Sequence, residues 1–144
     1  MREILFRGKR VDNGEWVYGY LCVFKGVSQM YVPFTEEEEK ENEGHIFSAI
    51  GGVWHIIIPE TVGQYTGLTD KNGKKIFEGD IVKYDDLTGI INYSFGCYCV
   101  KTNKPDWRNR NNPAIDIVFN EYPNEIKVIG NIHDNPELLE GGEE

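Results

Sequence analysis

Two thiols separated by one residue, Cys97 and Cys99, are the first candidates for chemistry in this chain of 144 residues. Alternate residues of a strand share one face, so these thiols would lie ~6.5–7 Å apart along it. Structural zinc usually requires Cys-x₂₋₄-Cys and two further ligands. The other thiol and imidazole candidates are scattered along the chain: Cys22, His45, His55 and His133. We therefore expect ordinary buried, reduced thiols, with no metal and no cofactor.

Neighbouring acids and bases do not make a catalytic set. Glu78 and Asp80 are two residues apart and could share a strand face, and His133 with Asp134 could form an acid–base pair. The simpler interpretation is a surface corner before a strand for the first pair and a turn for the second. No serine-hydrolase, zinc-protease or phosphate-loop motif occurs, and no nucleophile stands beside a base. We predict no catalytic residues and no enzymatic activity.

A basic loop is the best candidate for nucleic-acid binding. Residues 101–110, KTNKPDWRNR, carry four bases and one acid around a tryptophan. Lysine and arginine can neutralise phosphates while an exposed aromatic ring stacks on a base. The alternative is an ordinary polar connection with the tryptophan packed into the protein. We favour this alternative because a neutral body with acidic segments does not attract the negative charge of nucleic acid. The candidate contacts are Lys101, Lys104, Trp107, Arg108 and Arg110.

The acidity of the chain is concentrated in two short segments. Residues 36–43, EEEEKENE, hold six glutamates and one lysine, and four more glutamates lie at 137, 140, 143 and 144. Together these segments account for the whole net charge of −9, so the remaining chain is neutral. Like-charge runs of this kind are typically solvated. A role as an acidic inhibitor of a host factor is therefore a secondary alternative.

The elements that must position these groups are predicted to be strands. Seven Phe, eight Tyr and three Trp suit a pleated surface, and sixteen Gly indicate many turns. Alanine occurs only twice, at Ala49 and Ala114. The composition predicts a mainly β protein of short antiparallel strands and hairpins.

The first hairpin carries the most apolar strand of the N-terminal portion. Residues 4–11 and 15–23 are joined by Asn13-Gly14, a pair that suits a type I′ turn with positive φ at both positions. Both faces of the second strand are apolar, which indicates a sandwiched strand or a subunit contact. The alternative is that its aromatic side chains fill the monomer core. The candidate interface residues are Trp16, Tyr18, Tyr20, Tyr31 and Trp54.

Further elements follow the same reasoning. Thr35 and Glu38 could cap a short helix in the acidic segment, and residues 53–58 read as a buried strand ended by Pro59. Five or so short strands, including 115–119, predict a small SH3-like barrel in the C-terminal portion. A helical turn should follow Asn135-Pro136. The expected portions are 1–60 (hairpin and oligomerisation), 61–139 (small barrel) and 140–144 (disordered acidic tail).

Four segments together resemble the YopX family, which is found in bacteriophages and in prophages of Gram-positive bacteria. They are MREILFRG (1–8), WVYG (16–19), QYTGLTDKNGKKIFEGDIV (64–82) and IGNIHDNPELL (129–139). The resemblance implies a small, phage-encoded and multimeric protein without an assigned biochemical activity. It offers no catalytic residues to carry over.

The function predicted on this basis is a non-catalytic, homo-oligomeric protein-interaction module of phage or prophage. Its partner would be a second copy of the chain. A host or phage protein is an alternative partner, and nucleic acid is a partner that we do not favour. No signal peptide and no apolar run of about 20 residues is visible, so we expect the cytoplasm of a bacterial host and no membrane contact.

Overall fold

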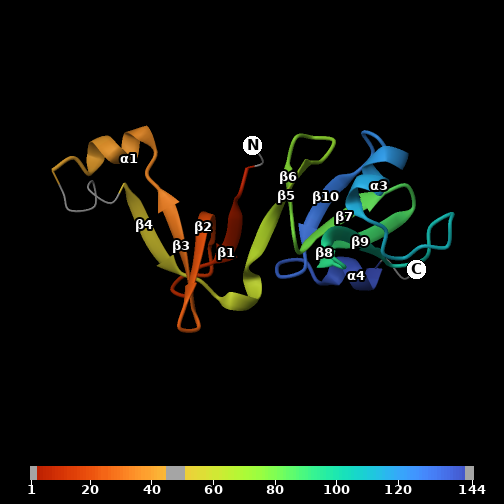
Figure 1. Ribbon diagram of the computed structural model, residues 1–144, viewed down its shortest axis with the longest axis horizontal. Helices are drawn as coiled ribbons and strands as arrows, with labels where there is room; N and C mark the ends of the chain where they lie inside the picture. The colour runs from red at the N-terminus through yellow and green to blue at the C-terminus, as the bar shows by residue number, and fades with distance from the viewer. Residues whose placement is uncertain (1–2, 45–50, 142–144) are drawn as a thin grey trace. The chain divides into compact units, whose positions relative to one another are not determined.

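The computed structural model describes residues 3–44 and 51–141, which divide into two compact units between Gln64 and Tyr65. The prediction of a mainly β protein is confirmed (Figure 1). The first unit contains β1 (Phe6–Lys9), β2 (Trp16–Phe24), β3 (Val27–Pro33), α1 (Glu36–Glu41), β4 (Gly52–Ile56), the 3₁₀ turn η1 (Pro59–Thr61) and the start of β5 (Gly63–Thr69). The second contains the rest of β5, β6 (Lys75–Phe77), β7 (Asp80–Tyr84), β8 (Leu87–Ser94), β9 (Cys97–Thr102), α3 (Ile115–Glu121), β10 (Lys127–Asn131) and α4 (Glu137–Gly141).

The sheet of the first unit has the antiparallel strand order β4-β3-β2-β1-β5. Strand β5 begins beside β1 and continues into the second unit, where it pairs with β6. Among the residues of this unit that the structure describes, few large apolar side chains are fully buried; Met30 and Ile57 are, and they pack beside Gly8. A side chain at Gly8 would collide with Ile57, so glycine permits this close approach. Within residues 3–44 and 51–64 the sheet is therefore thin, with little core on either face.

The second unit is built on the antiparallel sheet β10-β7-β8-β9. Its core is one contiguous cluster of ten buried residues: Ile76, Val82, Tyr84, Leu87, Ile91, Val100, Ile115, Val118, Ile126 and Val128. The expected small barrel is not formed, because the sheet of the described residues stays open, with β10 and β9 at its ends. Backbone bonds from Val100 and Thr102 to the segment leading to α3 occupy the outer edge of β9.

The strand expected at 115–119 is instead the helix α3. Ile115 and Val118 are buried, and Phe119 and Tyr122 pack against the same cluster. These residues recur at the three- and four-residue spacing of a helix, so one helical face covers the sheet. Burial of that face outweighs the strand preference of the β-branched residues.

The hairpin predicted at Asn13-Gly14 forms, but its turn differs. Gly14 has positive φ whereas Asn13 does not, and the same is true of Gly73 and Asn72 in the β5–β6 connection, so neither connection is a type I′ turn. Two positive φ angles in succession occur at Lys25-Gly26 and Phe95-Gly96, which join β2 to β3 and β8 to β9. These two-residue connections match the right-handed twist of their strands.

Both predicted helical segments are present. Thr35 and Glu38 form the complete capping box of α1. Helix α4 forms as the predicted C-terminal turn, and the Asn135 side chain before it accepts a hydrogen bond from the Asn131 amide. The acidic tail predicted at 140–144 lies mostly outside the described residues. None of the helices described here is both long and apolar enough to cross a membrane.

Candidate functional site

One face of the β2–β3–β4 sheet carries a row of aromatic rings. The strand register places Tyr20 opposite Tyr31, and Tyr31 opposite Trp54. The ring centroids of Tyr20 and Tyr31 are 6.5 Å apart, and those of Tyr31 and Trp54 are 5.3 Å apart. Tilted rings at these separations attract one another. Three strands therefore combine their aromatic side chains into one continuous surface.

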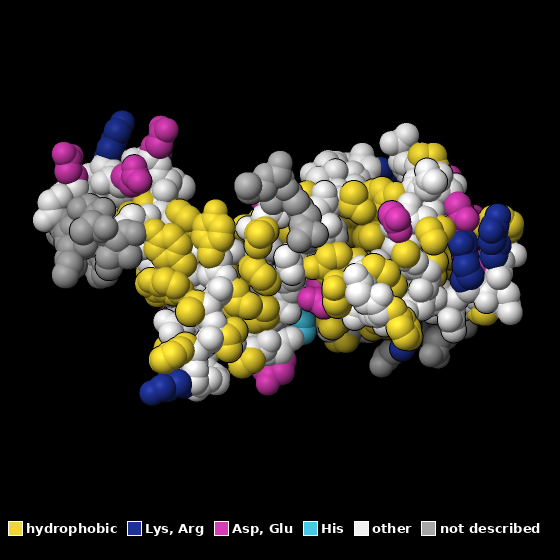
Figure 2. All heavy atoms as spheres, in the orientation of Figure 1, with side chains coloured by type: hydrophobic (Ala, Val, Ile, Leu, Met, Phe, Trp, Pro, Cys, Tyr) yellow, Lys and Arg dark blue, Asp and Glu magenta, His cyan; other side chains and the backbone are white. Residues whose placement is uncertain are grey.

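This aromatic face is open. The exposed fraction is 53% for Tyr20 and 46% for Trp54. The next cross-strand rows, built by the same registers, extend the surface with Phe24 opposite Val27 and with Ile56 beyond Gln29. The large apolar side chains exposed on this face are Tyr18, Tyr20, Phe24, Val27, Trp54 and Ile56. In the view of Figure 2, hydrophobic side chains gather over β2, β3 and β4.

Of the five predicted interface residues, all lie on this one face, but they differ in exposure. Trp16 is half-buried at one end, with the Arg7 guanidinium 4.8 Å and the Lys9 ammonium 5.4 Å from its ring centroid. Tyr31 is half-buried in the middle of the row.

Phe24, Val27 and Ile56 belong to the same face but were not singled out from the sequence. Continuing the alternation of β2 through the Lys25-Gly26 turn would have found the first two. The strand expected to be buried at 53–58 is half-exposed instead: it ends at Ile56, which stands 58% exposed.

The register of this sheet depends on close backbone contacts at glycine. A Cβ atom at Gly19 would overlap the carbonyl oxygen of Tyr31, and one at Gly52 would meet the Val32 carbonyl oxygen at 2.5 Å. Glycine at both positions lets neighbouring strands approach without a steric clash. The strand register that aligns the aromatic row therefore depends on glycine at both positions.

The basic loop at 101–110 forms one ion pair within itself and two with residues outside it. Arg110 contacts Asp106 at 2.7 Å and Glu121 of α3 at 2.6 Å, and Lys104 lies 3.6 Å from Asp86. The Arg108 guanidinium lies 4.5 Å from the ring centroid of Trp107, and that ring is 65% exposed. The charges are thus partly neutralised within the protein, while the tryptophan is not packed into the body.

The ion pair between Asp106 and Arg110 orders this loop. Burial alone would raise the pKa of Asp106, but hydrogen bonds from the Arg110 guanidinium and from the amides of Arg110 and Arg108 hold that pKa below its usual range. The two carboxylates in turn raise the pKa of Arg110. Asp106 accepts these backbone amides at 2.9 Å, so it acts as the organising residue of the turn.

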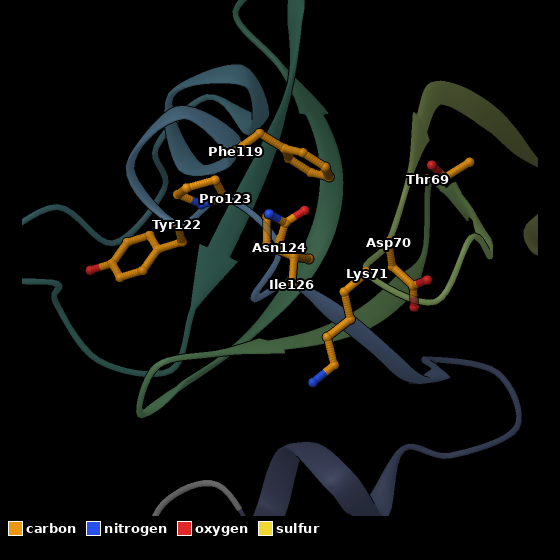
Figure 3. A pocket seen from close by; sticks show the side chains of 8 residues that line it. All are labelled: Thr69, Asp70, Lys71, Phe119, Tyr122, Pro123, Asn124 and Ile126. Carbon is orange, nitrogen blue, oxygen red and sulfur yellow. The ribbon is translucent and has the colours of Figure 1, made fainter.

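A small cavity of about 190 Å³ lies in the second unit (Figure 3). Phe119, Tyr122 and Pro123 come from α3 and its C-terminal end, and Asp70 and Lys71 come from the β5–β6 connection. The Asp70 carboxylate accepts three backbone amides, from Asn72, Lys74 and Val128, and so is committed to the fold. Ligand sites for small molecules usually measure 300–1,000 Å³, so this cavity is small for one.

The cysteines do not match the prediction of ordinary buried thiols. Cys22 and Cys97 are exposed, and Cys99 alone is buried. The sulfur atoms of Cys97 and Cys99 lie 3.7 Å apart. No group of three or more potential metal ligands gathers among residues 3–44 and 51–141. His45, considered above as a possible ligand, lies outside the described residues.

The fold and surface define a mainly β protein of two units, one with a compact core and one whose sheet exposes an aromatic face. A family model described as YopX protein matches residues 5–140, which is nearly the whole chain. The chain belongs to the YopX family. No curated protein matches the sequence.

Proposed function

We propose that this protein is a non-catalytic interaction module of a phage or prophage, acting in the cytoplasm of a bacterial host. It self-associates by stacking the aromatic face of β2, β3 and β4 on the same face of a second copy. The observation that carries the proposal is the open row Tyr20–Tyr31–Trp54 on a thin sheet. A sheet with an apolar face is stable when another layer covers it.

The size of the face suits an interface. Six large apolar side chains of the described residues are exposed on it, and at roughly 100 Å² each they leave on the order of 600 Å² uncovered per copy. The largest apolar patch on a typical monomer is about 300–600 Å². A standard protein–protein interface buries about 800 Å² per partner, so the apolar area that one copy exposes on this face approaches what one partner of an interface buries.

A second copy is the occupant that best matches the chemistry of the face. The rows centred on Tyr20 and Cys22 contain no acidic or basic side chain, so stacking two copies buries no like charges there. Two antiparallel sheets packed face to face form a sandwich with about 10 Å between them. Lys9 lies at the β1 margin, where an interface rim tolerates its charge, and Arg7 of the same strand is already buried within the single chain.

Sedimentation velocity across a micromolar concentration series tests the proposal. The wild type should sediment as an oligomer, and Tyr20→Lys should shift it toward monomer because a charge would enter the stacked faces. Tyr93→Lys is the matched control: Tyr93 is 57% exposed and also pairs with a cross-strand tyrosine, Tyr98, but it lies in the second unit. A wild type of 16.5 kDa at every concentration would refute self-association.

If Tyr20→Lys and Tyr93→Lys weaken the oligomer equally, the chain associates through another surface. A wild-type monomer whose aromatic face becomes protected only with an added phage or host protein would replace the second copy with that partner.

Nucleic-acid binding by the basic loop is the weaker candidate. Arg110 is tied to two carboxylates, and Lys104 is paired with Asp86. Trp107 and Arg108 are the features that still favour it, because an exposed ring beside a guanidinium can stack on a base. A low-salt gel shift that Lys104→Glu/Arg108→Glu abolishes would revive this function.

A further inference from the structure

A pair of thiols lies at the start of β9, directly after the β8–β9 turn, and neither the family nor the proposed interaction explains it. Cys97 and Cys99 occupy the same face of β9, and their sulfur atoms are 3.7 Å apart. Both thiols point toward the carbonyl oxygen of Ser94, at 3.5 Å from Cys97 and 3.8 Å from Cys99. Two sulfurs that share one acceptor are held in van der Waals contact.

The two thiols differ in access. Cys97 follows the Phe95-Gly96 turn and is exposed, whereas Cys99 is buried at an isolated bridge with Ala114. Burial, followed by the hydrogen bond with Cys97, raises the pKa of the Cys99 thiol to about 11. An oxidant from solution therefore reaches Cys97 first, and Cys99 stands behind it as a protonated thiol.

We propose that Cys97 and Cys99 form a site of reversible oxidative modification, in which a peroxide converts the pair to an intramolecular disulfide. The Cys97 thiolate attacks one peroxide oxygen, the O–O bond breaks, and Cys97 becomes a sulfenic acid while hydroxide leaves and takes a proton to form water. The Cys99 sulfur then attacks the Cys97 sulfur, loses its proton and displaces a second water. Two thiols and one peroxide thus give one disulfide and two waters.

The geometry also predicts that the bond is easily reduced. Alternate residues of a strand are ~6.5–7 Å apart at Cα, at the upper limit for a disulfide of about 6.8 Å. Closing the bond must contract β9 beside the turn, where Gly96 gives the backbone freedom. Strained disulfides have more oxidising potentials than structural ones, so a thiol reductant should reopen this one.

Intact-mass spectrometry of the full chain treated with stoichiometric hydrogen peroxide tests the site. The wild type should lose about 2 Da, two of its three thiols should stop reacting with a thiol reagent, and dithiothreitol should restore both. Cys22→Ser is the matched control and should still lose about 2 Da, because Cys22 is exposed but belongs to the other unit.

Cys97→Ser and Cys99→Ser should each abolish the 2 Da loss, and Cys99→Ser should instead trap a sulfenic acid at Cys97 that a dimedone probe labels. Oxygen addition to the wild type without loss of two thiols would overturn the proposal, as would a disulfide that requires Cys22. These readouts use the single chain, so they stand or fall independently of self-association.

Discussion

Truncating Trp54 to alanine should weaken self-association strongly. Trp54 is 46% exposed on the aromatic face, which corresponds to roughly 100 Å² of ring surface open to a partner. At ~25 cal/mol per Å² this surface is worth about 2.5 kcal/mol per copy. A twofold interface uses the residue twice, so the upper limit is about 5 kcal/mol per dimer. Half of that amount already raises the dissociation constant about 60-fold.

Sedimentation equilibrium of wild type, Trp54→Ala and Trp107→Ala would measure this difference. Trp107 is the matched control, because it is a more exposed tryptophan, at 65%, in the second unit. Loss of the ring contact with Tyr31 should cost the monomer about 0.5–1.5 kcal/mol, which urea unfolding would detect separately. Two folded tryptophan variants that both keep the wild-type dissociation constant would refute association through Trp54.

Three further predictions concern stability and the thiol pair. Gly19→Ala should lower the free energy of unfolding by about 1–3 kcal/mol in a urea titration, because its Cβ atom would overlap the Tyr31 carbonyl oxygen. Asp70→Ala should cost about 3 kcal/mol, since three amides including that of Val128 lose their acceptor. Burial raises the pKa of Asp70, but these bonds outweigh it and hold the pKa below its usual range. The part of the stabilisation that depends on the ionised carboxylate is therefore complete above the unfolded pKa of roughly 4 and is lost in acid, where the difference between wild type and variant should narrow. The pKa of the Cys99 thiol is raised to about 11, so between about pH 7 and pH 9 its reactive thiolate fraction grows about tenfold per pH unit. The rate at which Cys99 closes the disulfide should rise by the same factor in stopped-flow measurements. A pH-independent rate would contradict this prediction.

Several features of the fold were predictable because they depend on neighbouring residues alone. The capping box of α1 needs only Thr35 and Glu38, three positions apart. Trp16, Tyr18 and Tyr20 share one face of β2, as their spacing of two residues requires, since side chains of a strand alternate.

Other features depended on contacts between distant segments. The residues at 115–119 are β-branched or aromatic in four of five positions, yet they form a helix because Ile115 and Val118 must cover the sheet of the second unit. The pairing of Arg110 with Glu121 likewise requires the loop to lie against α3. Neither result follows from local propensity, which tertiary burial can override.

The amino-acid sequence by itself determined the strand-rich character of this protein, its hairpins and the composition of each strand face, since turn chemistry and side-chain alternation act over a few residues. Only the tertiary structure decided which face stays uncovered and which side chains meet. The rings of Tyr20, Tyr31 and Trp54 line up because strand registers join residues far apart in the chain. The two sulfurs of β9 come into contact because their side chains converge on one carbonyl oxygen, an orientation that the spacing of residues in a strand does not specify.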